Sequence, residues 1–220
     1  MYSYKVSGIA KSYGKKAVLK NMDFSICPGE CIGIVGNNGC GKSTFLRILA
    51  GTLKADACAL KEEAEGLIIG YVPQENPLFE NLSVLDNLKF WYCDTESSIN
   101  EDLNNGVLKI FKLDTVLKSK VKKLSGGMKK RLSIACALAK RPTLLILDEP
   151  GASLDLLCKE DIRNYIKEYV KAGNSVVMAS HEETELSVCS RLYLMEDGML
   201  KELPCPISVA ELQKRMLSHE

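Results

Sequence analysis

Short runs of apolar residues recur along the chain and predict the strands of a buried sheet. The clearest are residues 31–35 (CIGIV), 67–72 (LIIGYV), 143–147 (TLLIL) and 175–179 (SVVMA). Runs of about four to eight residues without polar alternation are typical of strands that helices cover on both faces. Residues 2–26 also favour strands, although glycines and a lysine pair interrupt their apolar positions.

Helical spacing of apolar residues fills several intervals between these runs. We expect residues 42–50 to form a helix that Gly51 can terminate, and residues 158–171 to form another. Ser83 is a favourable N-cap for a third helix. Residues 103–111 carry apolar side chains at helical spacing and predict a fourth.

The order of these elements predicts an α/β fold. Strands and helices alternate, which favours a mainly parallel sheet covered by helices. The stretch at about residues 75–124 differs in character and is predicted to be a small helical subdomain inserted between core elements. Near the C-terminus, Asp197-Gly198 separates two apolar runs and predicts a hairpin with a two-residue turn. Since no internal repeat is evident, residues 1–220 are predicted to form one domain.

Composition limits the classes of protein to which the chain can belong. It has 220 residues, 46% of them apolar and 26% charged, which is ordinary for a globular protein with one sizeable core. The net charge of +1 favours neither nucleic acid nor an anionic membrane as a partner. No apolar run approaches the ~20 residues of a membrane span, and residues 1–6 lack the apolar stretch of a secretory signal. We therefore expect a cytoplasmic protein, held at a membrane only through a partner.

A glycine-rich loop lies between a predicted strand and a predicted helix. It fits the phosphate-loop pattern GxxxxGK[ST] and comprises Gly36, Asn37, Asn38, Gly39, Cys40, Gly41, Lys42, Ser43 and Thr44. Glycines let backbone N–H groups converge on phosphate oxygens, and the helix dipole favours negative charge there. Lys42 is predicted to reach the β- and γ-phosphates, and Ser43 to coordinate Mg²⁺. Alone, this loop indicates only that the chain binds a nucleotide.

Nine cysteines and two histidines raise the question of metal or disulfide chemistry. No two cysteines have the CxxC spacing of a zinc site, so we expect reduced cysteines with structural roles. Cys40 differs because it lies in the phosphate loop. A helix N-terminus lowers a thiol pKa, so we expect Cys40 to undergo alkylation from which bound nucleotide protects it.

Two carboxylates follow the apolar run at residues 143–147. Asp148 is predicted to organise Mg²⁺, and Glu149 to be the base that orients and polarises an attacking water. By itself, an acidic strand end before Pro150 is also compatible with a solvated surface. The phosphate loop favours the catalytic interpretation.

Together with LSGGM at residues 124–128, these motifs resemble the nucleotide-binding subunits of ATP-binding cassette (ABC) transporters across nearly the whole chain. The resemblance implies a P-loop NTPase fold of the ABC ATPase type, in which the mainly parallel core carries an N-terminal antiparallel β subdomain and an inserted helical subdomain. It also implies that Ser125, Gly126 and Gly127 contact the γ-phosphate of ATP bound by a second copy. Two glycines at a helix N-terminus offer unpaired N–H donors for such a contact.

Four further residues match positions of this family. The resemblance implies that Tyr13 stacks on adenine and that Gln74 touches Mg²⁺ and water. It also implies that His181 contacts the γ-phosphate and that Asp155 lies in a loop that communicates across a dimer. The implied catalytic set is therefore Glu149, His181, Gln74 and Lys42, and the implied metal ligands are Ser43, Gln74 and Asp148.

Some positions depart from the commonest family pattern. Met128 replaces a glutamine, and this variant before a basic run resembles the ATPases of ABC-2-type and haem exporters. Residues 151–153 (GAS) also differ, in the loop before Asp155, and leave the catalytic set intact. The segment at residues 52–66 is short and acidic, so we expect the antiparallel subdomain to be smaller than is usual in the family.

The sequence therefore predicts the ATP-hydrolysing subunit of an ABC transporter. Its expected partners are ATP with Mg²⁺, a second identical or related ABC ATPase subunit, and an integral membrane subunit, with export favoured and no nucleic acid. Two alternatives stay open: a soluble ABC ATPase acting on ribosomes or DNA, and a phosphate-loop kinase or non-hydrolysing nucleotide-binding module. A single cassette and near-neutral charge disfavour the first, and Glu149 and His181 disfavour the second.

Overall fold

The computed structural model describes residues 4–93, 95, 97–152, 154–205 and 207. The remaining residues, among them three at the N-terminus and Ser153, lie outside this description. The strands are β1 (Tyr4–Tyr13), β2 (Lys16–Ile26), β3 (Cys31–Val35), β4 (Leu60–Glu63), β5 (Ile69–Val72), β6 (Leu144–Asp148), β7 (Ser175–Ala179), β8 (Arg191–Glu196) and β9 (Met199–Leu203). The α-helices are α1 (Lys42–Leu49), α2 (Val84–Tyr92), α3 (Ile99–Asn104), α4 (Val107–Ile110), α5 (Gly126–Leu138), α6 (Leu156–Lys171) and α7 (Glu183–Leu186), and 3₁₀ turns span Leu113–Thr115 and Val121–Lys123.

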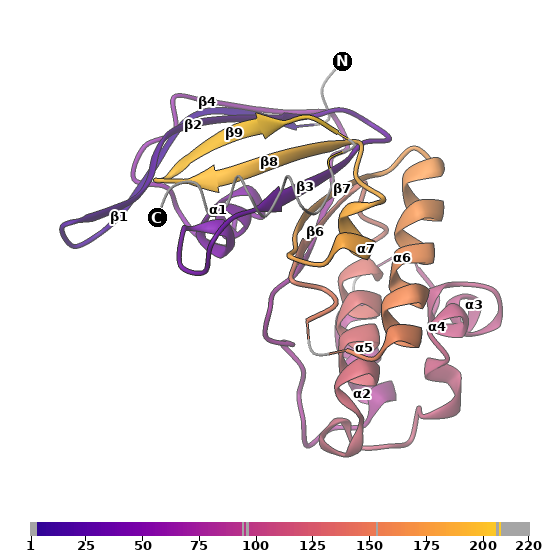
Figure 1. Cartoon of the computed structure of the whole chain (residues 1–220). Coiled ribbons are helices and arrows are strands. Elements are labelled where there is room, and N and C mark those ends of the chain that lie inside the picture. Colours follow the sequence, from indigo (N-terminus) through magenta and orange to yellow (C-terminus); the bar gives the residue numbers. More distant parts are fainter. Residues whose placement is uncertain (1–3, 94, 96, 153, 206, 208–220) are drawn as a thin grey trace.

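The strands of the described chain assemble into two sheets (Figure 1). The larger has the order β5-β6-β7-β3-β8-β9; all its neighbouring pairs are parallel except the β8–β9 hairpin. The smaller sheet is antiparallel and has the order β2-β1-β4. The predicted α/β fold, with a mainly parallel core and an N-terminal antiparallel subdomain, is therefore confirmed. The short acidic segment still supplies the third strand, β4, of that subdomain.

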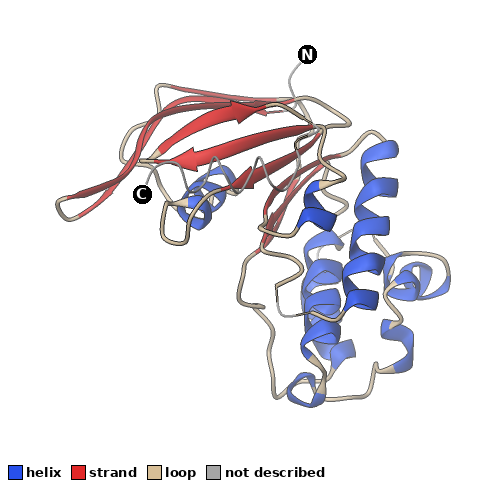
Figure 2. Ribbon diagram, viewed as in Figure 1, coloured by secondary structure: helices blue, strands red, loops and turns tan. Residues whose placement is uncertain are grey.

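Every residue of β3, β6 and β7 is buried. Successive side chains of a strand point to opposite sides, so both faces of the sheet are covered at these strands. In β6, Leu144 and Ile146 belong to one apolar cluster, whereas Leu145 and Leu147 belong to another. Helix α1 packs in the first cluster, where its Phe45 ring meets an aromatic ring of β2 edge to face at 5.5 Å. Figure 2 shows the resulting division: the strands and α1 lie at one end of the molecule, and the other helices gather beside them.

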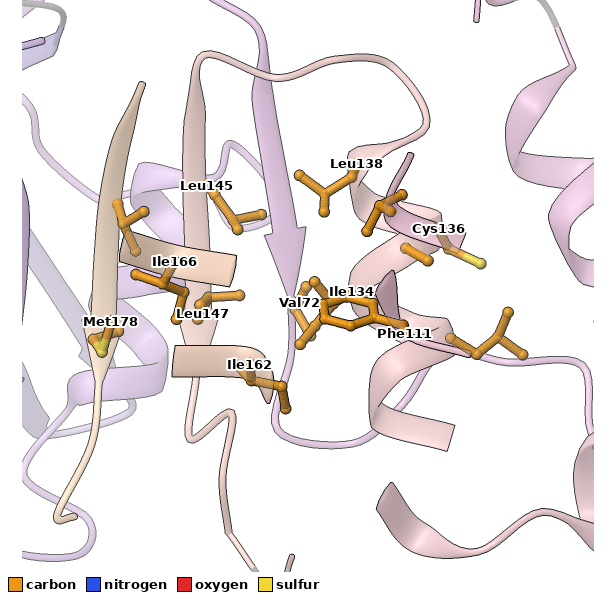
Figure 3. Close-up of a cluster of buried hydrophobic side chains, with 14 of the residues drawn as sticks. Val72, Phe111, Ile134, Cys136, Leu138, Leu145, Leu147, Ile162, Ile166 and Met178 are labelled. Carbon is orange, nitrogen blue, oxygen red and sulfur yellow. The ribbon is translucent and has the colours of Figure 1, made fainter. Parts of the chain in front are cut away.

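The second cluster joins the sheet to the helices, as Figure 3 shows. Leu147 of β6 lies near Ile166 of α6, and Val72 of β5 lies near Phe111 and Ile134. Helices from inside and outside residues 75–124 contribute to this one cluster. The inserted helical region therefore shares its core with the parallel sheet, and its boundaries stay a prediction.

The prediction of one helix over residues 103–111 is wrong. Two short helices, α3 and α4, meet at Asn105-Gly106 instead. A Cβ atom at Gly106 would lie 2.1 Å from Oδ1 of Asp102, which is buried and accepts a hydrogen bond from Tyr92 at 2.5 Å. Arg141 pairs with the same carboxylate at 2.9 Å. The buried Asp102 carboxylate therefore occupies the space that a side chain at residue 106 would need, and the helix breaks at this glycine.

Two predicted turn and cap signals are confirmed. Ser83 caps α2 in a reciprocal arrangement with Asp86, each side chain accepting from the other's backbone N–H. Asp197 and Gly198 both have positive φ angles, 49° and 76°, as a tight turn between β8 and β9 requires. Of the helices in the described part of the chain, none combines the length and apolar character that crossing a bilayer requires.

Candidate active site

The phosphate loop runs from the end of β3 to the start of α1, as its sequence predicts. Gly36, Gly39 and Gly41 have φ angles of 152°, 77° and 115°, which L side chains rarely adopt. At Gly36 a Cβ atom would also lie 2.4 Å from the carbonyl oxygen of Met195. The helix that follows has no side-chain cap, because its N-cap residue is Gly41. Its first N–H groups are therefore left for a ligand.

Lys42 is turned into this loop. Its side chain is buried, and Nζ donates to the carbonyl oxygens of Gly36 at 2.7 Å and Asn37 at 3.2 Å. The loop borders a cavity of about 380 Å³, and three of the four predicted catalytic residues, Lys42, Gln74 and Glu149, line it. The cavity is lined by Val18, Asn38, Gly39, Gly41, Lys42, Ser43, Thr44, Gln74 and Glu149.

Asp148 lies at the end of β6 and is buried. Burial raises the pKa of its carboxyl, and a hydrogen bond from the Ser43 side chain opposes that rise. Its Oδ1 atom is buried without a hydrogen-bond partner in the described structure. An unpartnered buried carboxylate oxygen beside a hydroxyl is an arrangement of hard oxygen donors that suits Mg²⁺. These residues therefore fit the predicted metal.

Glu149, Gln74 and His181 come together at the same edge of the sheet. Gln74 Nε2 donates to Glu149 Oε2 at 2.9 Å, and His181 Nε2 lies 3.8 Å from Glu149 Oε1. Glu149 has a φ of 48°, unusual for a residue with a side chain, and its N–H donates to the carbonyl of Ala179. Burial, together with the charge of Lys42, lowers the pKa of His181, while Glu149 opposes the shift. The imidazole is therefore neutral near pH 7.

The LSGGM segment lies apart from this cavity. Ser125 caps α5 and accepts from the N–H of Met128 at 3.3 Å, and no described atom beyond its chain neighbours and its own helix backbone lies within 4 Å of where a Gly126 Cβ would be. Asp155 caps the neighbouring helix α6. Its Oδ2 is 3.6 Å from the Cβ position of Gly127, so these two helix N-termini are adjacent. None of these four residues lines the cavity of the phosphate loop.

Sequence comparison assigns this arrangement to a known family. A family model described as "ABC transporter" matches residues 19–152, more than half of the chain. The chain belongs to the ABC transporter family. The resemblance inferred from the LSGGM segment and the phosphate loop is therefore confirmed.

Individual ABC relatives cover most of this chain. It is 34% identical to the Nod factor export ATP-binding protein I of Rhizobium etli, over 87% of this chain and 65% of that protein. It is 35% identical to the linearmycin resistance ATP-binding protein LnrL of Bacillus subtilis, over 86% of this chain and 65% of that protein. A sulfate/thiosulfate import ATP-binding protein CysA of Bacillus cereus is 30% identical, over 95% of this chain and 63% of that protein. The chain thus spans just under two thirds of the length of these curated relatives.

Solved ABC cassettes share the fold. A dimeric ATP-binding cassette in a post-hydrolysis state, bound to ADP and Pi, superposes with a TM-score of 0.80 at 26% identity, covering 93% of this chain and all of that one. A nucleotide-free cassette superposes with a TM-score of 0.79 at 25% identity, covering 99% of this chain and 96% of that one. The predicted P-loop NTPase fold of the ABC ATPase type is confirmed.

Tyr13 lies at the end of β1, next to the turn into β2. It pairs with Lys16 across the turn between β1 and β2, is half exposed, and has the ammonium of Lys11 5.8 Å from its ring centre. It does not line the cavity of the phosphate loop. Its stacking on adenine stays a prediction.

The expected lowering of the Cys40 pKa is wrong. The thiol is half-buried, and burial raises its pKa although the charge of Lys42 and backbone N–H groups oppose the shift. Cys40 is therefore a poorer nucleophile than its place in an ABC phosphate loop indicates.

Val18 of β2 is a cavity residue that sequence reasoning missed. It lines the cavity already described and a second one, of about 340 Å³, that adjoins Asn37–Cys40 and the β8–β9 turn. A valine in a strand carries no sequence signal for this position. The signal comes only from the packing of β2 beside the phosphate loop of the ABC cassette.

Proposed function

We propose that the chain binds MgATP, hydrolyses it in a dimer of cassettes and powers a separate membrane subunit. The observation that carries this proposal is the convergence of Lys42, Gln74, Asp148, Glu149 and His181. Lys42, Gln74 and Glu149 line the cavity of about 380 Å³ beside the phosphate loop. Asp148 adjoins it through the Ser43 side chain, and His181 through Glu149, whose Oε1 lies 3.8 Å from His181 Nε2. We propose residues 1–220 as one cassette, with about 75–124 as its inserted helical part.

Nucleotide binding would use hydrogen-bond donors at the start of α1 and on Lys42. The N–H groups at the start of α1 have no side-chain cap, and the Lys42 ammonium can exchange loop carbonyls for phosphate oxygens. Ser43, Asp148 and Gln74 are the proposed holders of Mg²⁺, which when bound neutralises charge on the β- and γ-phosphates.

Hydrolysis would depend on Glu149. Its carboxylate is proposed to orient and polarise the attacking water, and the hydrogen bond from Gln74 holds that carboxylate in place. His181 stays neutral near pH 7 because its pKa is lowered, so its ring can donate one hydrogen bond to the γ-phosphate without a further charge. A module that only binds nucleotide, without hydrolysing it, would not need Glu149 or His181.

A second copy would complete the site. Two adjacent helix N-termini lie outside the cavity that would hold this chain's own nucleotide; they carry Ser125, Gly126, Gly127 and Asp155. We propose that they close over ATP held by a partner cassette, with each Tyr13 stacking on its adenine. ATP would then favour the closed dimer because it contacts both halves, and hydrolysis would remove those contacts.

The membrane subunit is proposed to dock on an aromatic patch formed by Phe79, Phe90 and Trp91. Phe79 and Phe90 are exposed, and successive rings meet edge to face at 5.1 and 5.8 Å. The patch begins five residues after Gln74, and Asn87 holds the backbone of Phe79 through two hydrogen bonds. Exposed aromatic clusters of this kind mark interaction sites. Export is favoured by Met128, and the expected location is the cytoplasmic face of a membrane.

The activity is tested by phosphate release. The purified chain should release inorganic phosphate from MgATP without forming a phosphorylated acceptor. Transfer of phosphate to a second substrate would instead indicate a kinase. Binding without any release would indicate a nucleotide-binding module.

The docking surface is tested by co-purification from detergent-solubilised membranes of the native host. The wild-type chain should retain a polypeptide with several membrane spans, and Phe90→Asp should lose it. Met199→Asp is the matched control, because Met199 is a similarly exposed apolar residue on β9. Equal recovery with both variants would contradict the proposed patch.

A further inference from the structure

Two buried charged side chains near the catalytic carboxylates have no role in the chemistry proposed above. Lys130 of α5 is 3% exposed and Glu185 of α7 is 4% exposed. Charged side chains are rarely buried to this degree unless a partner or a function requires them. Each contacts backbone or side-chain groups of a segment that carries a proposed catalytic residue.

Lys130 holds the segment of Gln74. Its Nζ donates to the carbonyl oxygens of Pro73 and Gln74, each at 3.2 Å. The ammonium also lies close enough to Asp148, Glu149 and Glu185 to interact electrostatically with them. It therefore holds the backbone of Gln74, the residue whose Nε2 donates to Glu149 Oε2.

Glu185 contacts two segments next to Glu149 in the structure: the one with Ser180 and the one with Gly151. Its Oε2 accepts a hydrogen bond from Ser180, the residue before His181. Its Oε1 has no hydrogen-bond partner in the described structure and lies against Gly151, where a Cβ atom would be only 2.1 Å away. Gly151 follows Glu149 by two residues, so one carboxylate touches both the histidine segment and the segment after Glu149.

We propose that Lys130 and Glu185 are positioning residues for ATP hydrolysis, holding the Gln74, Gly151 and Ser180 segments around Glu149. The inference rests on the proposed ATPase function and assigns these residues no contact with substrate.

The same two contacts relate the catalytic carboxylate to the proposed dimer surface. Lys130 lies in α5, the helix that begins with Gly126, so its hydrogen bond would transmit a shift of that helix to the backbone of Gln74. Glu185 lies against Gly151, four residues before Asp155 in the chain. Engagement of either helix N-terminus by a second copy would therefore reach Glu149 through one of these residues. A small displacement of a catalytic group is enough to slow turnover strongly.

The test separates kcat from nucleotide binding. Glu185→Gln keeps the shape of the side chain and an acceptor for Ser180, and Lys130→Met removes the ammonium and its two hydrogen bonds. We expect kcat to fall about ten-fold or more in each, with nucleotide affinity within about three-fold of wild type. Glu183→Gln and Lys167→Met are the matched controls, because both residues are exposed, and both controls should keep wild-type kcat.

Each outcome decides the inference. Wild-type kcat in Glu185→Gln or in a folded Lys130→Met, or a parallel loss of nucleotide affinity and kcat, overturns the positioning role of that residue. If Lys130→Met does not fold, Glu185→Gln alone is decisive. Glu149→Gln, assayed alongside, distinguishes this failure from that of the proposed function. A wild-type chain that turns over no faster than Glu149→Gln overturns the ATPase itself, and the inference with it.

Discussion

Helix N-termini lie both at the phosphate-loop cavity and at the LSGGM end, the adjacent starts of α5 and α6. The two places differ in whether a side chain caps the helix. Helix α1 begins at Gly41 without a side-chain cap, whereas α5 and α6 are capped by Ser125 and Asp155. Around the cavity, Lys42 and Asp148 are buried. At an uncapped helix start beside a buried lysine, free backbone N–H groups and the ammonium can bind a phosphate without first losing a side-chain cap.

The LSGGM end is open by comparison. Among the described residues, no atom outside the start of α5 itself lies within 4 Å of the Cβ position of Gly126, and Leu156 and Leu157, directly after Asp155, are 82% and 73% exposed. Apolar side chains this exposed at a helix start cost solvation free energy in an isolated chain. The difference indicates that the cavity is built by one chain, while the other end is built to meet something outside it. The following predictions test that contrast.

The largest effect is expected at Glu149, within the cavity. Glu149→Gln should lower kcat by roughly 10²–10⁴-fold, because a general base in place typically contributes that factor. Nucleotide affinity should change little, because the amide has the same shape. Steady-state phosphate release and a direct binding titration measure the two quantities. Turnover at the wild-type rate would remove Glu149 from the chemistry.

Lys42 tests the phosphate cradle of the same cavity. Lys42→Ala should weaken ATP binding by roughly 10–100-fold, because hydrogen bonds to a charged group contribute about 1.5–3 kcal/mol. Isothermal titration with ATP measures the change. Lys167→Ala, at an exposed position on α6, is the control. Unchanged affinity in Lys42→Ala would contradict the cradle.

Ser125 tests the open end. In the Glu149→Gln background, ATP should produce a dimer on size analysis, and Ser125→Arg should weaken that dimer by about ten-fold or more through steric and charge conflict. ATP binding by the monomer should persist, because Ser125 does not line the cavity. Ser187→Arg, at an exposed serine on the C-terminal side of α7, is the control. An ATP-dependent dimer that survives Ser125→Arg would show that the two ends do not meet across a dimer.

The smallest effect is expected at Ser83, in neither region. Ser83→Ala removes one partner of the capping arrangement with Asp86 and should lower the free energy of unfolding by about 1 kcal/mol. ATP affinity should stay unchanged, because α2 does not reach the cavity. Chemical denaturation measures the first quantity. A loss of ATP affinity would mean that the helical region and the cavity are coupled more closely than their contacts indicate.

Much of the fold follows from local patterns. The apolar runs at residues 31–35 and 175–179 coincide with β3 and β7, and the phosphate loop leads into α1 as expected. Turn and cap residues such as Asp197 and Ser83 also act where the sequence indicates. These features are predictable because each depends on side-chain periodicity or backbone geometry within a few residues.

The misses share a physical cause. The helix break at Gly106 depends on the buried carboxylate of Asp102, which pairs with Arg141, 35 residues beyond Gly106 in the chain. The raised pKa of Cys40 depends on how deeply the loop is buried, which no local pattern gives. Burial and charge at a residue are set by segments that the fold brings to it, so local sequence signals predict them poorly.

The amino-acid order alone determined the family, the strand and helix pattern and the identity of the phosphate-loop and carboxylate motifs, because those are properties of short segments. Only the tertiary structure decided that Gln74, Glu149 and His181 meet, that Ser125 and Asp155 stay outside their cavity, and that Lys130 and Glu185 lie buried behind it. These relations join residues far apart in the chain, and they exist only once the parallel sheet has brought its strand ends to one edge.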